Sequence, residues 1–290
     1  MNLEEKNYLN LLDSVLKTGS VREDRTGVGT IGLFGTQLRF NLENNIVPML
    51  TTKKMFTKAI IEELLFFIRG ETNTKLLEDK GVNIWKGNTS REFLDKKGLQ
   101  YLPEGDMGKG YGYQWRKFGE HDNGDSICKN GIDQLQQVFD TIKNNPNDRR
   151  MIISAWNPQQ LPEMALPPCH LLFQFYVDNG YLSCQWYQRS VDMFLGLPFN
   201  ILSYAILTRI MAQATGLKAK EVIFTGGDTH IYSNHADQVK EQISREPYNF
   251  PTMQINKNIS SIQDIEKLSF EDFVIDNYQH HPAIKAPMAI

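Results

Sequence analysis

Hydrophobic and polar residues follow two different periods along this chain, and each period predicts one kind of element. Apolar positions three or four residues apart predict helices at residues 4–18, 57–69, 132–145, 199–215 and 233–246. Apolar runs and apolar–polar alternation between turn residues predict strands at residues 31–42, 151–156, 170–177, 181–188 and 221–232. Residues 178–180, between two of these strands, are typical of a β-hairpin. Together the elements predict an α/β (α+β) fold.

Residues 1–290 are predicted to form a single domain, because the chain has neither an internal repeat nor a low-complexity linker. Residues 85–131 are polar and loop-rich, but their aromatic residues indicate packing rather than a flexible tether. With 41% hydrophobic and 22% charged residues, the composition is that of a globular protein.

Charge and cysteine content narrow the classes of protein further. A net charge of −3 gives no general attraction to DNA, RNA or an anionic membrane. The longest apolar runs are too short or too polar to span a bilayer, and the first residues are too polar for a signal peptide. The three cysteines have no C-x-x-C spacing, so we expect reduced thiols and a cytoplasmic location.

Gly27, Gly29 and Gly32 match the G-x-G-x-x-G pattern of dinucleotide-binding sites. Such a site needs a strand before the glycines, a helix after them and an acidic residue about 20 positions further on. Here a helix precedes the glycines, a strand follows them, and residues 51–53 are not acidic. We therefore expect no nicotinamide cofactor at this position.

Cys169 is the first candidate for chemistry, because two prolines fix the backbone ahead of it and a strand begins directly after it. The alternative is a small core residue, a common place for cysteine. A reactive thiol needs nearby positive charge. Arginines at turns and strand ends can supply that charge, and their planar forks match phosphate oxygens. These arginines are Arg25, Arg149, Arg150 and Arg189.

Several polar residues in apolar surroundings are further candidates. Glu62 and Glu63 share an apolar helix on which neighbouring side chains point about 100° apart, so at most one is expected to face the core. A core-facing glutamate has a raised pKa and can act as general acid or base, whereas the alternative is two solvated carboxylates. His230 and Tyr232 can share one face of a strand, and Asn200 begins a buried helix as a cap or a ligand contact. The six histidines predict no metal site.

The motifs DRTG, IIEELL, GYGYQWR, DRRMIISAWNP, ALPPCH, LSCQWYQRSVDMFLGLPFNI and TGGDTHIYSNH follow one another, and the chain ends in HPAIKAPMAI. In this order they resemble the folate-dependent thymidylate synthase family, from about residue 8 to residue 290. The resemblance implies a methyltransferase of dTMP biosynthesis that converts dUMP to dTMP, with 5,10-methylenetetrahydrofolate donating both carbon and hydride. It also implies a mixed, mainly antiparallel twisted sheet packed by helices, and a homodimer formed through the sheet face.

The same resemblance implies a role for each candidate. Cys169 would attack C6 of the uracil ring, while Arg189 would bind phosphate and favour the thiolate. Asn200 would hydrogen-bond both O4 and N3–H of the base, which an amide can do because it carries a donor and an acceptor. Glu63 would organise waters for proton transfer, and Tyr111 would help to remove the C5 proton. The other catalytic candidates are His170 and Asp192.

Two sets of binding residues are implied as well. The dUMP contacts are Arg25, Arg149, Arg150, Gln188, Arg189, Ser190, Val191, Asp192, Asn200, His230 and Tyr232. The folate contacts are Lys53, Phe56, Trp85, Asn88, Asp192, Leu195, Gly196, Phe199, Ala289 and Ile290. Lys53 would face the glutamate tail, and residues 285–290 would close as a lid that excludes water. Arg149 and Arg150 would reach the phosphate in the other subunit of the dimer.

Two positions depart from the pattern of the family. Where the family often has G-P-V-Y-G, residues 108–112 read GKGYG, which keeps Tyr111 but changes its approach through Lys109. Trp186 stands where a smaller aliphatic side chain is usual.

Three other functions compete with this one. A pyrimidine hydroxymethylase would add water instead of hydride, but Trp85 and the lid are expected to exclude water, and the Asn200 amide suits uracil better than cytosine. A Cys–His hydrolase is disfavoured because adjacent Cys169 and His170 point to opposite faces of a strand. A binding protein without activity is disfavoured because the nucleophile and the arginines are all present.

Overall fold

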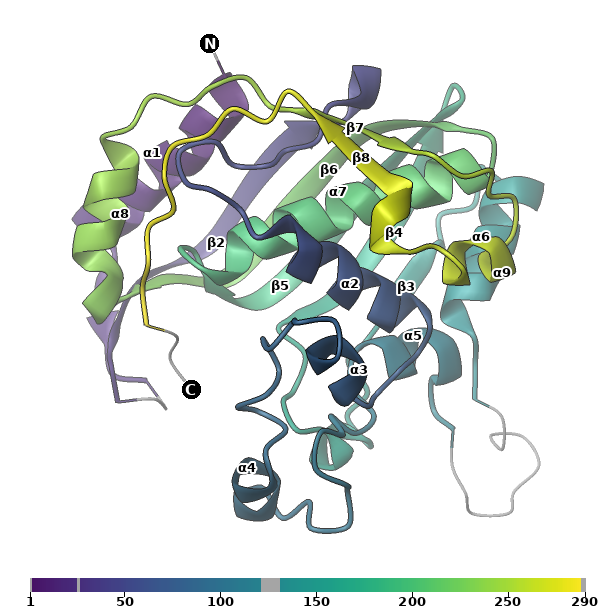
Figure 1. Ribbon diagram of the computed structural model, residues 1–290, viewed down its shortest axis with the longest axis horizontal. Coiled ribbons are helices and arrows are strands. Elements are labelled where there is room, and N and C mark those ends of the chain that lie inside the picture. Colours follow the sequence, from purple (N-terminus) through teal and green to yellow (C-terminus); the bar gives the residue numbers. More distant parts are fainter. Residues whose placement is uncertain (1, 25–26, 121–130, 288–290) are drawn as a thin grey trace.

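A six-stranded sheet is the frame of the computed structural model, which describes residues 2–24, 27–120 and 131–287 (Figure 1). In spatial order its strands are β1 (Ser20–Arg22), β2 (Thr30–Asn41), β6 (Lys218–Tyr232), β5 (Tyr181–Asp192), β4 (His170–Asp178) and β3 (Ile152–Ser154). Strands β5 and β6 run parallel, and the other neighbouring pairs are antiparallel. The predicted mixed, mainly antiparallel sheet is thus confirmed.

The long strands lie where the apolar pattern predicts them. The predicted hairpin joins β4 to β5 through Asn179 and Gly180, whose φ angles of 49° and 81° suit a two-residue turn. The edge strand β3 is shorter than predicted, since only Ile152–Ser154 pair with β4. A separate pair consists of β7 (Thr252–Ile255) and β8 (Phe273–Asp276).

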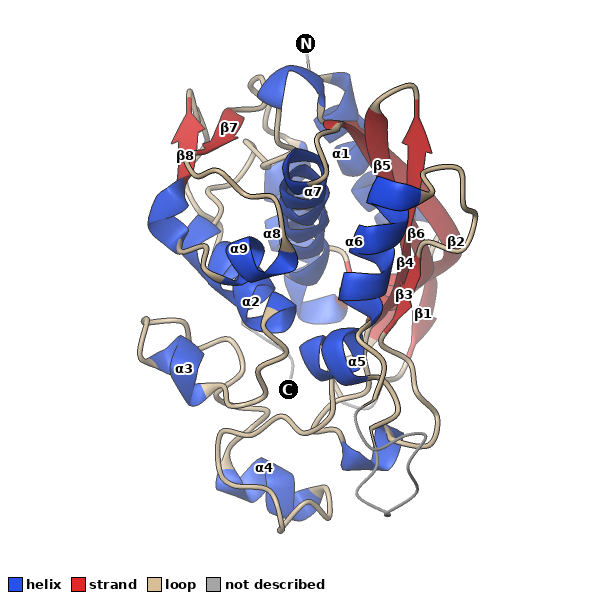
Figure 2. Cartoon of the chain, turned by 90° about the vertical axis from the view of Figure 1, so that its right-hand side faces the viewer, coloured by secondary structure: helices blue, strands red, loops and turns tan. Residues whose placement is uncertain are grey.

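Helices gather on one side of the sheet in the described part of the chain (Figure 2). The longer ones are α1 (Leu3–Thr18), α2 (Thr57–Ile68), α6 (Gln134–Asn144), α7 (Gly196–Ala214) and α8 (Ala236–Ile243). The short ones are α3 (Lys75–Glu78), α4 (Arg91–Lys96), α5 (Gly112–Lys117) and α9 (Ile262–Glu266), with 3-10 turns η1 (Glu43–Asn45), η2 (Leu161–Glu163), η3 (Ser233–His235) and η4 (Phe270–Asp272).

Helix α7 is the central element of the core. It begins earlier than the prediction of residue 199, because Pro198 in its first turn is compatible with a helix start. Trp186 of β5 stacks on Tyr204 of α7 with ring centroids 4.7 Å apart, and it also contacts Phe224 of β6. The unusual tryptophan therefore fills the layer between the sheet and α7, where a large aromatic ring buries much apolar area.

The other side of the sheet is not covered by the described helices (Figure 2). Along β4, Phe173 and Phe175 are buried against the helices, whereas Tyr176 is 62% exposed. Along β3, Ile153 is buried and Ile152 is 44% exposed. Apolar side chains that face away from the core on neighbouring strands are typical of a protein–protein interface.

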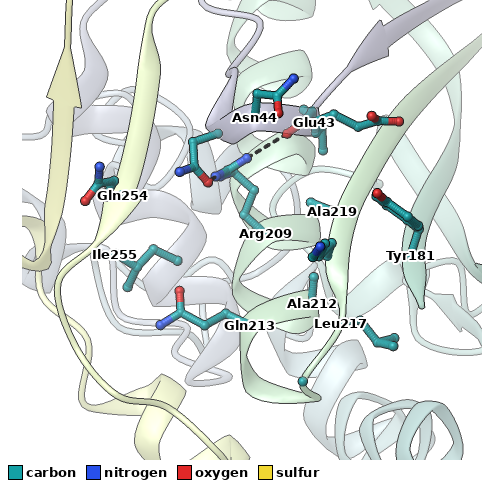
Figure 3. A pocket seen from close by; sticks show the side chains of 14 residues that line it. Glu43, Asn44, Tyr181, Arg209, Ala212, Gln213, Leu217, Ala219, Gln254 and Ile255 are labelled. Atoms are coloured by element: carbon teal, nitrogen blue, oxygen red, sulfur yellow. Dashed lines mark hydrogen bonds between the residues drawn. The ribbon is translucent and has the colours of Figure 1, made fainter.

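A cavity of about 750 Å³ lies at the C-terminal end of α7, away from the candidate residues (Figure 3). Arg209 lines it and ties three segments together. Its guanidinium donates to the carbonyls of Leu42 (2.9 Å) and Met253 (3.1 Å) and to the Asn45 side chain. Burial lowers the pKa of Arg209 to about 10, and within residues 2–24, 27–120 and 131–287 no carboxylate pairs with it. The contacts indicate a structural role.

Replacing Arg209 is expected to destabilise the fold without touching the catalytic candidates. In an Arg209→Met variant the Leu42 and Met253 carbonyls lose their donor, which is expected to cost about 3 kcal/mol of unfolding free energy. Urea denaturation measures this loss. The control is Lys218→Met at the exposed rim of the same cavity, expected to change stability by less than about 0.5 kcal/mol. Equal stability of the two variants would contradict the structural role.

Candidate active site

Cys169 lies directly ahead of β4, beside Arg189 of the neighbouring strand β5. The Cys169 Sγ is 4.0 Å from Nη2 of Arg189, and the Arg189 N–H donates to the Cys169 carbonyl (2.9 Å). The guanidinium donates to the carbonyls of Pro168 (2.8 Å) and Pro167 (3.0 Å), and it lies over the Trp156 ring at 5.5 Å. A cation held this rigidly beside a partly exposed thiol favours the thiolate, the nucleophilic form.

Tyr111 reaches the same thiol residue from the turn before α5. Its hydroxyl oxygen accepts the backbone N–H of Cys169 at 2.9 Å. The ring stacks on Phe67 with centroids 4.9 Å apart and packs against Trp85 and His170. Burial raises the pKa of Tyr111 well above its usual value, so the phenol stays protonated at neutral pH.

The backbone around Tyr111 is held in an unusual conformation. Tyr111 has φ 39°, a left-handed value that a tyrosine adopts only when its surroundings impose it. The next residue, Gly112, approaches α2 so closely that a Cβ atom would lie 2.4 Å from the Phe67 carbonyl oxygen. Glycine at position 112 therefore allows the tyrosine ring to pack against Phe67.

Glu63 of α2 is the glutamate with the raised pKa. Trp85 Nε1 donates to its Oε1 at 2.7 Å. Burial raises the pKa of Glu63 to about 7, although the hydrogen bond from Trp85 opposes the shift. The expectation that at most one of the two glutamates is buried holds, but the buried one is Glu62, which is 5% exposed, whereas Glu63 is half-buried. Glu62 is buried under Lys80, whose Nζ lies 2.6 Å from its Oε2.

The raised pKa of Glu63 predicts a specific dependence of stability on pH. Its folded-state pKa, about 7, lies above the ordinary value of 4.5, so the folded protein binds a proton that the unfolded chain releases between these values. Stability contributed by this group is therefore present at low pH and lost as pH rises toward 7, by about 3 kcal/mol at most.

A Glu63→Gln variant is expected to lack this component. The free energy of unfolding is measured in urea at pH 5 and pH 8. Between these values the wild type is expected to lose more of it than the variant. A difference that does not change with pH would show that Glu63 has an ordinary pKa.

Asn200 and Gln188 meet between α7 and β5. Asn200 Nδ2 donates to Gln188 Oε1 at 2.9 Å, and Gln188 Nε2 donates to the Ser190 carbonyl at 3.1 Å. Because α7 begins at Gly196, Asn200 is inside its first turns and is not a helix cap. Within residues 2–24, 27–120 and 131–287, one Nδ2 hydrogen and the Oδ1 of Asn200 have no other hydrogen-bond partner, which leaves a donor–acceptor pair for a planar ligand.

The two histidines among the candidates have different partners. His170 Nδ1 is 2.9 Å from the hydroxyl of Tyr204 on α7, and burial lowers the pKa of His170 to about 3. His170 is therefore neutral and directed to α7, which agrees with the expectation that it is not a base for Cys169. His230 Nδ1 lies 3.0 Å from Asp228 Oδ1, and its ring contacts Tyr232 on the same strand.

Comparison with known proteins agrees with the sequence motifs. The thymidylate synthase family model matches residues 6–290. The chain is 52% identical over 99% of its length to the thymidylate synthase of Homo sapiens, covering 91% of that protein. It is 51% identical to the thymidylate synthase of varicella-zoster virus (strain Dumas), over 99% of the chain and 94% of the viral protein.

The chain belongs to the thymidylate synthase family. The family was predicted from the motifs and is confirmed. The chain is also 53% identical over its full length to the bifunctional dihydrofolate reductase-thymidylate synthase of Leishmania major. It spans 56% of that bifunctional relative, little more than half.

Asp192 and Lys53, two candidates for the site, lie at the turn that precedes α7. Asp192 Oδ1 accepts the N–H groups of Phe194 (3.0 Å) and Leu195 (3.2 Å), which fixes the turn into the helix. Lys53 lies under this turn: its Nζ donates to the Phe194 carbonyl and lies 3.7 Å from the centre of the Phe194 ring. Burial lowers the pKa of Lys53 to about 7, opposed by the charge of Asp192.

Lys53 differs from the expectation that it faces a folate tail. Only 6% of it is exposed, because Nζ points inward to the Phe194 carbonyl. Contact with a glutamate tail would require Nζ to leave that carbonyl. By contrast, Phe56, three residues further on, is 52% exposed.

The remaining candidates fall into three groups. Arg149 and Arg150 lie at the surface before β3, and their guanidinium groups make no hydrogen bond or ion pair with Cys169 or Arg189 in the described structure. Arg25, Ala289 and Ile290 lie outside the described residues. The others belong to three elements: Ser190 and Val191 to β5, Gly196 and Phe199 to the first turn of α7, and Asn88 to the loop after α3.

Tyr204 is a site residue that the sequence argument missed. Its hydroxyl pairs with His170, and its ring supports Trp186. The signal was available, because Tyr204 is four positions after Asn200 and so lies on the same face of α7.

In the portion covered by the structure, no helix is long and apolar enough to cross a membrane, and no three side chains of His, Cys, Asp or Glu form a metal-binding group.

Proposed function

We propose that this chain converts dUMP to dTMP by reductive methylation. The observation that carries the proposal is the placement of the Cys169 thiol 4.0 Å from the Arg189 guanidinium, with the donor–acceptor amide of Asn200 on the adjacent helix. A nucleophile, a phosphate-binding cation and a uracil-reading amide are the three groups that this reaction requires. Family membership supports the same reaction, with 5,10-methylenetetrahydrofolate as the second substrate.

Each candidate residue is assigned its own step of the proposed reaction. The Cys169 thiolate adds to C6 of the uracil ring, and the electron pair moves toward O4, where Asn200 donates a hydrogen bond. Bound methylenetetrahydrofolate would supply the one-carbon unit and the hydride, leaving as dihydrofolate. Tyr111 lies against the Cys169 backbone, where its hydroxyl can direct removal of the C5 proton. Loss of that proton releases the folate nitrogen from the added carbon, and the thiolate leaves C6 when the hydride reaches that carbon, which restores the C5–C6 double bond of the base.

Glu63 and Trp85 supply the proton relay and the wall of the proposed site. With a pKa of about 7, Glu63 can hold or release a proton at neutral pH, as a general acid–base group must. Trp85 is fixed by its hydrogen bond to Glu63 and by its contact with Tyr111, ring centroids 5.7 Å apart. A rigid indole beside the reacting carbon excludes water, which favours hydride transfer over the hydroxymethylase alternative.

Product identity tests the proposal. The protein is incubated with dUMP and methylenetetrahydrofolate, dihydrofolate is followed by its near-ultraviolet absorbance, and the nucleotide is weighed by mass spectrometry. Dihydrofolate together with a nucleotide of methyl mass supports the proposal. A hydroxymethyl product with tetrahydrofolate would show that water reaches the site, and recovery of unchanged dUMP would contradict both reactions.

We also propose that two copies of the chain associate through the uncovered face of the sheet. Tyr176 and Ile152 are exposed there, and Arg149 and Arg150 lie at the adjoining edge, where they can reach a phosphate in the partner subunit. Among the described residues, neither guanidinium group makes a hydrogen bond or ion pair with Cys169 or Arg189 of its own subunit, which supports this placement.

A charge on that face is expected to separate the subunits. Tyr176→Asp places a carboxylate in an apolar contact and is expected to raise the dissociation constant at least about tenfold, as measured by sedimentation velocity across a concentration series. The matched control is Leu76→Asp, an exposed apolar residue of α3 away from the sheet. Equal association of both variants would contradict an interface on the sheet.

A further inference from the structure

Two segments that carry catalytic candidates run side by side on their way to the site. Residues 107–111 end at Tyr111, and residues 163–169 end at Cys169. Gly108 and Met164 form an antiparallel bridge, and the Ala165 N–H donates to the Met107 carbonyl at 3.0 Å. The fit is close, because a Cβ atom on Gly108 would lie 2.0 Å from the Glu163 carbonyl oxygen.

Lys109 connects residues 107–111 to residues 163–169 through both its backbone and its side chain. Its N–H donates to the Glu163 carbonyl (3.2 Å), and its Nζ lies 2.8 Å from Oε2 of Glu163. Nζ also donates to the Glu120 carbonyl (3.3 Å), while the Lys109 carbonyl accepts from Gln114 Nε2 (2.8 Å). The Lys109 side chain is three-quarters buried, with 25% of it exposed.

Only Gly110 separates this anchored residue from Tyr111. A Cβ atom on Gly110 would meet nothing nearer than 3.7 Å, and the residue has no positive φ, so glycine there is not required by packing. It supplies no side chain to hold the backbone just before Tyr111, whose left-handed φ of 39° must be imposed from outside. The nearest side chain that can anchor this backbone on the N-terminal side is that of Lys109.

We propose that Lys109 is a positioning residue, whose ion pair with Glu163 sets the place of the Tyr111 hydroxyl against the backbone N–H of Cys169. The inference rests on the proposed function for its effect on turnover. An ion pair with side chains that are 25% and 36% exposed contributes little to stability. Loss of the pair is therefore expected to change catalysis more than folding, since small displacements of a catalytic group slow a reaction strongly.

The test compares Lys109→Met with Lys109→Arg, which keeps the charge, and with Lys117→Met, an exposed lysine of α5 outside the site. Lys109→Met is expected to lower kcat about tenfold, with KM for dUMP changed less than about threefold and Tm lowered by less than about 3 °C. Lys109→Arg is expected to recover most of kcat, and Lys117→Met to match the wild type.

Charge-reversal variants test whether Glu163 is the partner through which Lys109 acts. Lys109→Glu and Glu163→Lys are each expected to lower kcat, and the double variant, which restores the pair in reverse, is expected to recover it to within about threefold of the wild type. A double variant as slow as the single variants would overturn the ion pair as the cause. A kcat of Lys109→Met within about twofold of the wild type would overturn the positioning role.

A second readout does not depend on dTMP formation. The rate of Cys169 alkylation by iodoacetamide, measured by peptide mass spectrometry, is expected to change in Lys109→Met because the Tyr111 hydroxyl contacts the Cys169 backbone. Buried Cys184 serves as the internal reference. A wild type that forms no dTMP would reject the proposed function, yet altered alkylation in Lys109→Met would still support the positioning role. An unchanged alkylation rate would reject it.

Discussion

A Cys169→Ser variant is expected to bind dUMP with nearly the affinity of the wild type and to lose more than about 10³-fold in kcat. A serine hydroxyl is a far weaker acid than a thiol and stays protonated at neutral pH, whereas the Arg189 guanidinium 4.0 Å from Sγ favours the thiolate of Cys169. Arg189 and Asn200 keep their own contacts, to the Pro168 carbonyl and to Gln188, in the absence of the sulfur. Isothermal titration with dUMP and a steady-state assay measure the two quantities.

The second cysteine of the described structure provides the matched control. Cys184 is fully buried in β5, and burial raises the pKa of its thiol far above the usual range, so it is not a nucleophile. Cys184→Ala is expected to retain kcat within about threefold while losing some stability to the cavity it leaves. Activity above about 1% of the wild type in Cys169→Ser would contradict the assignment of the nucleophile.

An Asn200→Asp variant is expected to change which base the enzyme accepts. A carboxylate repels O4 of uracil but accepts from the exocyclic amine of cytosine, so the ratio of kcat/KM for dUMP to that for dCMP is expected to fall by about 10³-fold. Gln188 has to follow, because its Oε1 now accepts from Asn200 and would face a carboxylate. Turning the Gln188 amide gives up its 3.1 Å bond to the Ser190 carbonyl.

Parallel assays with dUMP and dCMP measure the change of base preference. Asn10→Asp, an exposed change of the same charge on α1, is the control and is expected to leave the ratio unaltered. If Asn200→Asp remained an enzyme for dUMP alone, base recognition would have to reside in other groups of the site.

Local patterns predicted most of the fold. The helix at residues 57–69 and the strand at residues 170–177 correspond to α2 and β4, because one-sided burial leaves a period in the sequence. The ends of the helices were predicted less well. Helix α7 begins at Gly196, before the predicted residue 199, because Asp192 holds the turn ahead of it and Pro198 is tolerated in a first helical turn. Such contacts are not visible in the apolar pattern.

Burial of charged residues was the weakest part of the prediction. Periodicity allowed one buried glutamate in α2 without saying which, and it is Glu62, since Lys80, 18 positions further along the chain, covers and neutralises it. Lys53 points inward for the same kind of reason: the Phe194 carbonyl and ring lie next to it in space and 141 positions away in sequence. A helical pattern contains no information about such distant partners.

The sequence by itself determined the element types, the single-domain α/β class, the family, and Cys169 and Arg189 as candidate residues, because these depend on residue type and local spacing. Only the tertiary structure decided which side chains meet. Tyr111 contacts a residue 58 positions away, Trp85 holds a glutamate 22 positions away, and His170 pairs with a tyrosine 34 positions away. The pKa of Glu63 and the neutrality of His170 follow from those contacts, since burial among distant segments sets the cost of charge.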